Sequence, residues 1–162
     1  MKALIQRVKG KTSILVKDKE KESSFFFEGV GLVVLLAWLE SDLSSNQLEK
    51  AEDWILSRIL GLRIFEDSEG KMNLSLEDYA QSNKLESGIL WVSQFTLGAE
   101  LESGFRPSFT KAMKPELAKV KYESFCKKIN QNSKHKNIFG QFGADMSLSF
   151  TNWGPVTILL EK

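Results

Sequence analysis

The feature that most constrains the fold is one unbroken apolar run, Val30-Gly31-Leu32-Val33-Val34-Leu35-Leu36-Ala37-Trp38. Such a run, rich in β-branched residues, is typical of a strand that is covered on both faces, because a half-exposed strand alternates apolar and polar side chains. Even with Leu39 it is far shorter than the ~20 residues of a membrane-spanning helix. It also lacks the charged start and the cleavage site of a signal peptide. We therefore expect a layered protein without a membrane partner.

Shorter apolar segments around this run predict the remaining strands. Residues 4–8 and 12–16 form two such segments, and Gly10 between them suits a turn. Residues 77–87 are mainly polar and predict a loop. Further extended patterns cover 25–27, 62–65, 72–76, 89–97, 144–151 and 156–160.

Two segments have the periodicity of helices. The first follows a capping-box pattern over 44–47, ends at Gly61, and carries its apolar residues at Leu48, Ala51, Ile55 and Ile59. The second begins near Pro115, and its apolar stripe consists of Ala118, Tyr122, Phe125, Cys126 and Ile129. Several strands with two main helices predict a mixed α/β fold, in which the helices pack on a twisted or barrel-like sheet.

Length and residue usage limit the chemistry. A chain of 162 residues and 18.3 kDa holds one hydrophobic core, so we expect a single domain over 1–162. One cysteine, Cys126, excludes a disulfide framework, and one histidine, His135, excludes a His-rich metal site within one chain. We interpret Cys126 as core packing and expect His135 on the surface, among the polar residues 133–137. We expect no cofactor or metal, and a location in the reducing cytoplasm.

Charge is unevenly distributed although the net charge is only +1. Residues 2–21 carry seven basic side chains and two acidic ones, and residues 106–136 carry nine basic and two acidic. Residues 40–102 between them carry thirteen acidic and five basic side chains. If the two basic segments fold onto one face, they form a patch that attracts phosphate. Scattered solvated lysines are the alternative interpretation.

The first candidate site is Ser93-Gln94-Phe95-Thr96, which follows the apolar start of the strand expected over 89–97. A polar strand end of this kind places hydroxyl, amide and backbone N–H groups at the margin of a sheet, where N–H groups can bind a developing oxyanion. Ser93 or Thr96 could alternatively act as a nucleophile, although no partner base is identifiable. A third interpretation is that Phe95 packs in the core and the polar side chains face water.

The second candidate site is Asn152-Trp153-Gly154-Pro155-Val156-Thr157. Proline cannot donate to a strand ladder and glycine adopts unusual dihedral angles, so this pair interrupts two predicted strands. Only about one X–Pro bond in twenty is cis in folded proteins, and a trans turn is the simpler interpretation. A cis bond would direct two carbonyl oxygens nearly the same way and make a rigid backbone gauge.

At these two motifs the sequence resembles the D-aminoacyl-tRNA deacylase family, also known as D-tyrosyl-tRNA deacylases. That family has the signatures Ser-Gln-Phe-Thr and Asn-x-Gly-Pro-x-Thr, which stand here at 93–96 and 152–157. Trp153 fills the variable position of the second signature with a large aromatic side chain. The resemblance continues in colinear order at 4–8, 62–67, 70–75, 104–109 and 142–146.

The resemblance implies a hydrolase that cleaves the ester bond between a D-amino acid and the 3′ end of tRNA, and glycyl-tRNA as a further substrate. It implies a homodimer in which Gly154 and Pro155 of one subunit reach into the pocket of the other and reject L-aminoacyl groups. It implies that the backbone N–H groups of Phe95 and Thr96 bind the oxyanion, that Ser93 and Gln94 belong to the same site, and that the tRNA 2′-hydroxyl assists. Asn152 is implied to belong to the same substrate-binding, chirality-reading group as Gly154 and Pro155, and Arg7 is implied to steady the Gly-Pro loop.

Two other functions remain open on the residues alone. The basic segments are compatible with a non-catalytic RNA-binding module, which would bind tRNA without turnover. A hydroxyl nucleophile at Ser93 or Thr96 would leave an acyl-enzyme that can be trapped.

Overall fold

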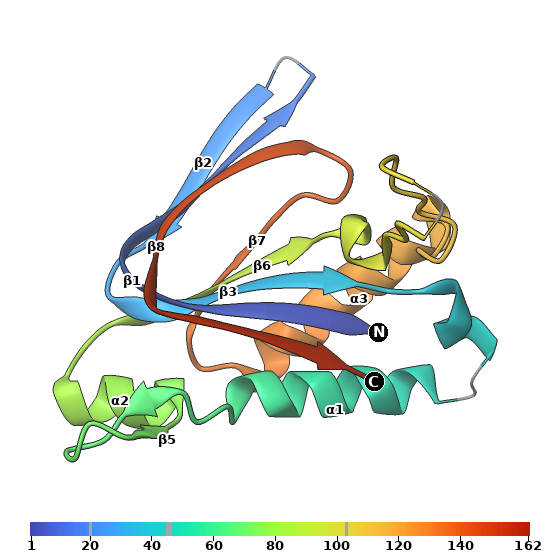
Figure 1. Ribbon diagram of the computed structural model, residues 1–162. Helices are drawn as coiled ribbons and strands as arrows, with labels where there is room; N and C mark the ends of the chain where they lie inside the picture. Colours follow the sequence, from blue (N-terminus) through green and yellow to red (C-terminus); the bar gives the residue numbers. More distant parts are fainter. Residues whose placement is uncertain (20, 45–46, 103) are drawn as a thin grey trace.

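The computed structural model describes residues 1–19, 21–44, 47–102 and 104–162, and within them a six-stranded mixed sheet forms the centre of the fold (Figure 1). Its order is β2-β1-β3-β6-β7, and β8 pairs with β1 beside this path. β1 is antiparallel to β2, β3 and β8, whereas β3–β6 and β6–β7 are parallel pairs. The strands are β1 (Lys2–Asp18), β2 (Lys21–Phe27), β3 (Val30–Ala37), β6 (Ser87–Ser93), β7 (Lys136–Phe139) and β8 (Asp145–Glu161). The strongly curved sheet is nearly closed as a barrel (Figure 1).

The apolar run forms β3, as predicted, and lies in the middle of the sheet between β1 and β6. Val33 and Val34 are both fully buried although their side chains point to opposite faces. The two faces belong to separate core clusters: Val34 packs with the helices, and Val33 packs inside the curved sheet. The run is continuous in apolar residues because both faces of the strand are covered.

One aromatic ring closes the inner cluster over two glycines. Gly31 of β3 pairs with Gly88 of β6, and the buried ring of Phe27 lies over both. A Cβ added to Gly31 would lie 2.6 Å from Phe27 Cε2, and one added to Gly88 would overlap the same ring. Phe27 therefore fills the volume above Gly88, and it shares the volume above Gly31 with the Gly88 carbonyl oxygen.

Two long strands replace the four short ones that the sequence predicted. Residues 4–8 and 12–16 belong to the single strand β1, and 144–151 and 156–160 belong almost entirely to β8. Gly10, with φ of 76°, bends β1 rather than ending it, and its N–H donates to Gly29 O at 2.7 Å. At this bend β1 changes its partner from β3 to β2.

Both predicted helices are present, as α1 (Leu48–Leu60) and α3 (Pro115–Asn132). Gly61 caps the C-terminus of α1, as expected. Gln47 precedes the first turn of α1 without a side-chain capping bond, and Ser45 and Asn46 of the predicted capping box lie outside the described residues. No helix in the described ranges is long and apolar enough to cross a membrane.

The expected loop over 77–87 is wrong, because most of it forms a third helix, α2 (Leu76–Asn83). Ser75 and Asp78 form a reciprocal capping box that starts this helix, and Lys84 ends it in the left-handed conformation. The polar residues face water, while Leu76 and Ala80 are buried. α2 follows a short hairpin of β4 (Phe65–Glu66) and β5 (Met72–Leu74), so the predicted extended segments at 62–65 and 72–76 are shorter than expected.

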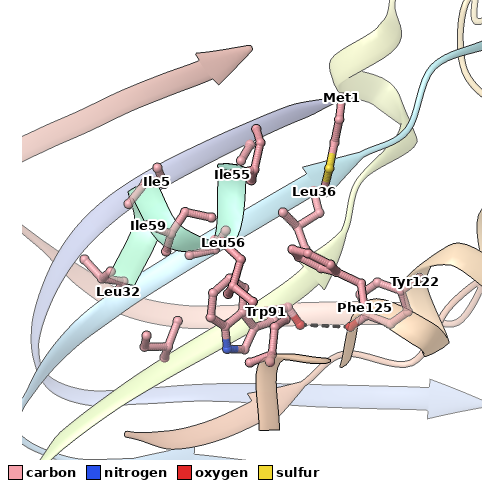
Figure 2. Packing of buried hydrophobic residues seen from close by; sticks show 14 of the residues in the cluster. Met1, Ile5, Leu32, Leu36, Ile55, Leu56, Ile59, Trp91, Tyr122 and Phe125 are labelled. Atoms are coloured by element: carbon pink, nitrogen blue, oxygen red, sulfur yellow. Dashed lines mark hydrogen bonds between the residues drawn. The ribbon is translucent and has the colours of Figure 1, made fainter. Parts of the chain in front are cut away.

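The main core lies between the sheet and the helices (Figure 2). Ile55 and Ile59 of α1 are fully buried there with Trp91 of β6. The hydroxyl of Tyr122 on α3 lies 3.0 Å from Trp91 O and 2.8 Å from Gly140 O, which anchors α3 to the sheet. Figure 2 shows this contact beside Phe125.

The expectation that His135 lies on the surface is also wrong. His135 is only 9% exposed, and its Nδ1 lies 2.8 Å from Ser87 Oγ. Its Nε2 is 3.8 Å from Glu77 on α2, the helix that the sequence pattern did not predict. Burial lowers the pKa of His135, against the opposing effect of Glu77. Cys126 packs against the main core as predicted, and burial raises its thiol pKa to about 11.

Candidate active site

A cavity of about 760 Å³ opens where β6 ends. Its walls come mainly from the end of β6, from the segment that leads into and begins α3, and from the residues at the start of β8, and Glu40 adds a fourth part of the chain at the rim. Most of the lining is apolar, and the polar groups gather at the strand end and at the rim. The lining residues are Glu40, Val92, Ser93, Gln94, Phe95, Phe109, Thr110, Ala112, Met113, Lys114, Pro115, Ala118, Phe142, Gly143, Ala144, Met146 and Leu148.

The first signature motif stands at this strand end. β6 stops at Ser93, and the Gln94 N–H donates to Leu36 O at 2.7 Å, which fixes the exit from the sheet. The Gln94 side-chain amide donates to Thr96 Oγ1 at 2.6 Å. The Phe95 ring is 56% exposed and meets Phe109 edge-on, with ring centroids 5.0 Å apart. Phe95 therefore lies at the cavity, so the alternative that it packs in the core is wrong.

A short 3₁₀ helix, η2 (Phe95–Gly98), replaces the last part of the strand predicted over 89–97. Its first internal backbone bond runs from Leu97 N–H to Gln94 O at 3.2 Å. The N–H groups of Phe95 and Thr96 precede that bond, so they have no acceptor inside the turn. Phe95 lines the cavity, whereas Thr96 is not in its lining among the described residues.

The second signature motif forms a bulge within β8. Thr157 pairs with Gln6 and Asn152 pairs with Val8, so the residues between them face the single residue Arg7. The Gly154–Pro155 peptide bond is cis, and Gly154 has a φ of 126°. Asn152 spans the bulge, because its Oδ1 accepts from Val156 N–H at 3.0 Å and its Nδ2 donates to Thr157 Oγ1 at 3.1 Å.

Arg7 holds the base of this bulge and is only 2% exposed. Its Nε donates to Trp153 O at 2.9 Å, and its Nη1 donates to Ile64 O at 2.6 Å. The guanidinium also lies 4.4 Å from the centroid of the Trp153 ring, within the range of a cation–π contact. Arg7 thus connects the Gly-Pro loop to the segment before β4.

Trp153 forms an aromatic cluster that the sequence did not predict. Its ring centroid lies 5.8 Å from that of Tyr79 and 6.2 Å from that of Phe65. Tyr79 belongs to α2, so this helix, which the sequence did not predict, also packs against the Gly-Pro loop through Trp153. The only sequence signal was a tryptophan at the variable position of the motif.

Within one chain the two motifs lie apart. In the strand register, Arg7 of β1 pairs with Leu32 of β3, and Leu32 pairs with Ile89 of β6. Ile89 lies four residues before Ser93, so the level of Arg7 and the end of β6 are ~13 Å apart along the strand direction. None of Arg7, Asn152, Gly154 and Pro155 belongs to the lining of the cavity in the part of the chain that the structure describes. The structure therefore brings Ser93, Gln94 and Phe95 together but leaves the Gly-Pro loop elsewhere on the same protomer.

Conventional catalytic groups do not gather at the cavity. Glu40 and Lys114 stand at its rim, and Glu40 Oε1 accepts from the Lys114 backbone N–H at 3.0 Å. Over the described residues, no group of three or more His, Cys, Asp or Glu side chains is placed to hold a metal ion. The polar groups available at the end of β6 are mainly backbone N–H groups and the Ser93 and Gln94 side chains.

The nearly closed sheet with its helices belongs to the mixed α/β class with a barrel-like sheet that the strand and helix pattern predicted, and it carries a cavity at the 93–96 strand end and a Gly-Pro bulge on an edge strand. The chain belongs to the D-Tyr-tRNA(Tyr) deacylase family, whose model matches residues 4–161.

Curated relatives agree with this assignment over the whole chain. A protein of Exiguobacterium sp. named D-aminoacyl-tRNA deacylase is 38% identical over 162 residues, covering 100% of this chain and 99% of the relative. One of Klebsiella pneumoniae with the same name is 40% identical over 161 residues, covering 99% of both.

Solved structures share the fold. A structure titled c-Myc DNA Unwinding Element Binding Protein is similar with a TM-score of 0.79 and 34% identity, covering 100% of this chain and 99% of the other. A second, titled as a probable eukaryotic D-amino acid tRNA deacylase, has a TM-score of 0.74 at 21% identity and covers 99% of both chains.

Proposed function

We propose that this chain hydrolyses the ester bond of D-aminoacyl-tRNA, releases the free D-amino acid and tRNA, and does so in the cytoplasm. The observation that carries the proposal is the opening of the Ser93-Gln94-Phe95 strand end into a largely apolar cavity, in a chain of this family. A cavity of about 760 Å³ is in the size range of small-molecule sites and has room for an aminoacyl group with its terminal nucleoside.

The chemistry is assigned to backbone groups. The N–H groups of Phe95 and Thr96, which have no acceptor in their own turn, would donate to the oxyanion that forms when water attacks the ester carbonyl. The tRNA 2′-hydroxyl would assist the attacking water. Gln94 positions this turn through its bond to Thr96 Oγ1, and Ser93 lines the cavity beside it. No side-chain nucleophile is required.

Chirality would be read by main-chain atoms of Gly154 and Pro155. Their carbonyls would leave no room for an L side chain, whereas a D side chain points away and a glycyl group has nothing to clash with. Specificity then comes from rejection of the wrong substrate. Asn152 and Arg7 would keep the loop in place, through the bonds that close the bulge and tie it to Ile64.

The loop would act on the cavity of a second copy in a homodimer. Two features support this: the distance between loop and cavity within one protomer, and the free edge of β8. In the described residues β8 pairs only with β1, so its other edge offers unpaired backbone groups along a strand of 17 residues. Leu159 on this strand is 49% exposed, as expected for a surface that a second copy covers.

A chirality-resolved deacylation assay tests the activity. We expect the purified protein to release D-tyrosine from D-tyrosyl-tRNA, to act on glycyl-tRNA and to spare L-tyrosyl-tRNA. EDTA should leave the rate of D-tyrosyl-tRNA hydrolysis unchanged, and replacing the terminal 2′-hydroxyl of the tRNA by hydrogen should abolish most of it. Equal hydrolysis of the two enantiomers, or loss of activity with EDTA, would contradict the proposal.

Subunit mixing tests where the loop acts. Gly154→Ala disables the loop, and Thr110→Trp, at an exposed position of the cavity rim, blocks the cavity. If the loop serves the partner, co-refolding the two inactive variants restores activity at about a quarter of the sites, because each heterodimer regains one intact site. Mixtures that stay inactive would show that the loop and cavity of one chain work together.

A further inference from the structure

The curved sheet leaves an open seam between its two end strands, β2 and β7. These strands end the path of the sheet, and a hollow of about 520 Å³ lies between them. The hollow belongs to neither signature motif. Its lining residues are Ser24, Phe25, Phe26, Lys136, Asn137, Ile138 and Phe139. We call this surface, together with Lys11, the seam patch.

An exposed aromatic ring between two cations dominates the seam patch. Phe26 is 49% exposed, and Phe25 beside it is 50% exposed. Lys11 Nζ lies 5.0 Å from the centroid of the Phe26 ring, and Lys136 Nζ lies 5.4 Å from it. Lys11 and Lys136 come from the two basic segments at 2–21 and 106–136, which therefore meet at this ring.

The chemistry of the patch matches a nucleotide. A half-exposed aromatic ring offers a stacking surface to a base, and two ammonium groups beside it attract the neighbouring phosphates. Among the described residues the lining contains no carboxylate that would oppose an anion. We propose that the seam patch binds single-stranded RNA, with a base stacked near Phe26 and phosphates at Lys11 and Lys136.

Strand register relates the patch to the cavity. Ile14 of β1 pairs with Phe25 on one side and with Leu148 on the other. Phe25 lines the seam, Leu148 lines the cavity, and two strand spacings separate them by ~10 Å. The seam is thus close to the cavity, and a tRNA whose 3′ end occupies the cavity would bring its neighbouring single-stranded nucleotides near this patch. We therefore identify the RNA as the single-stranded 3′ end of tRNA, an identification that rests on the proposed function.

Fluorescence anisotropy with a labelled eight-nucleotide single-stranded RNA tests the patch. Phe26→Ala should weaken binding by about 5- to 150-fold, which corresponds to the loss of one stacked base, and Phe26→Trp should retain it. Lys11→Gln with Lys136→Gln should reduce the slope of log K against log salt by about 1.4, because each phosphate contact on a single strand contributes about 0.7. Half-exposed positions tolerate these changes, and circular dichroism verifies that each variant is folded.

A matched double variant separates the patch from general charge. Lys50→Gln with Lys127→Gln removes two exposed lysines from α1 and α3, and it should leave the affinity and the salt slope unchanged. The proposal would be overturned if both Phe26→Ala and the Lys11→Gln/Lys136→Gln variant bound RNA with the affinity of the wild type. It would also be overturned if the wild type binds no RNA but Phe26→Ala alters self-association, since the patch would then be a protein interface.

A minimal substrate distinguishes this proposal from the proposed function. With D-tyrosyl-adenosine, which cannot reach the seam, Phe26→Ala should match the wild type, while its KM for D-tyrosyl-tRNA should rise. If the wild type hydrolyses neither substrate but RNA binding still depends on Phe26, the proposed function fails and the RNA site stands. Unchanged KM for tRNA in Phe26→Ala would refute the placement of the 3′ end here.

Discussion

Replacing Arg7 by methionine tests whether the buried guanidinium holds the Gly-Pro loop. The substitution keeps a long side chain but leaves Trp153 O and Ile64 O without their donors. Each hydrogen bond from a charged donor contributes about 1.5–3 kcal/mol, and the stacking on Trp153 about 1 kcal/mol more. Relief from burying the charge offsets part of this loss. We expect a net destabilisation of ~3 kcal/mol.

Arg58 provides the matched control. Its guanidinium lies 5.3 Å from the centroid of the Trp54 ring, but the side chain is exposed and makes no comparable carbonyl bonds among the described residues. Arg58→Met should therefore cost less than ~1 kcal/mol. Urea unfolding measures both, and Arg7→Met should also lower the melting temperature by ~6–12 °C. An effect of Arg7→Met no larger than that of Arg58→Met would refute the reasoning.

Three further predictions concern single positions. Gly154→Ala should lower the free energy of unfolding in urea by ~1–2 kcal/mol more than Gly104→Ala does. Both glycines have a similar φ, but a Cβ at Gly154 would lie 2.7 Å from Arg7 Nη2, whereas a Cβ at Gly104 would meet no atom within 4 Å. Equal effects of the two substitutions would show that the contact with Arg7 is harmless. Burial lowers the pKa of His135, so the unfolded chain binds its proton more readily, and stability should fall as the pH drops below about 6.5. His135→Gln should flatten that slope below about pH 6.5 and leave stability above it independent of pH at this site, and an unaltered slope would contradict the assignment. Thr96→Ala should lower kcat for D-tyrosyl-tRNA less than tenfold, because the backbone N–H remains; a loss above a thousandfold would favour a hydroxyl nucleophile.

The parts of the fold that sequence predicted best are those with strong periodic patterns. The apolar run forms β3 because both of its faces are buried, and the predicted stripe of α3 packs on the sheet. In α1 the predicted Leu48, Ile55 and Ile59 are buried, whereas Ala51 is only half-buried. Glu52 and Leu56 of α1 are buried in addition. The sequence predicts a turn at Gly10, whereas the structure has a bend inside β1, because composition does not tell whether a glycine ends a strand or lets it change partners.

The missed helix explains most of the remaining errors. Its start signal, Ser75 with Asp78, was present in the sequence, but only Leu76 and Ala80 carry the apolar face, which is too little for a periodicity argument. Without α2, nothing in the sequence indicated that His135 would be covered or that Tyr79 would pack against Trp153.

The candidate site was predicted in part. The predicted strand changes from apolar to polar residues near its end, and this change places Ser93, Gln94 and Phe95 at the margin of the sheet. The structure has the cavity at that margin. The opposite walls, from 109–118 and 142–148, carry no distinctive chemistry, so only the folded chain reveals that they face the strand end.

The ring of Phe27 over the glycine pair of β3 and β6 couples position 27 to position 88 in evolution, while Gly31 is constrained by the backbone as well. The atoms nearest to a Cβ at Gly88 all belong to the Phe27 ring, so enlarging Gly88 during divergence would require a smaller residue at position 27 in the same lineage. A Cβ at Gly31 would also overlap the Gly88 carbonyl oxygen, so Gly31 should stay glycine whatever residue stands at position 27. Libraries that randomise this region should recover glycine at position 31 and correlated residues at positions 27 and 88.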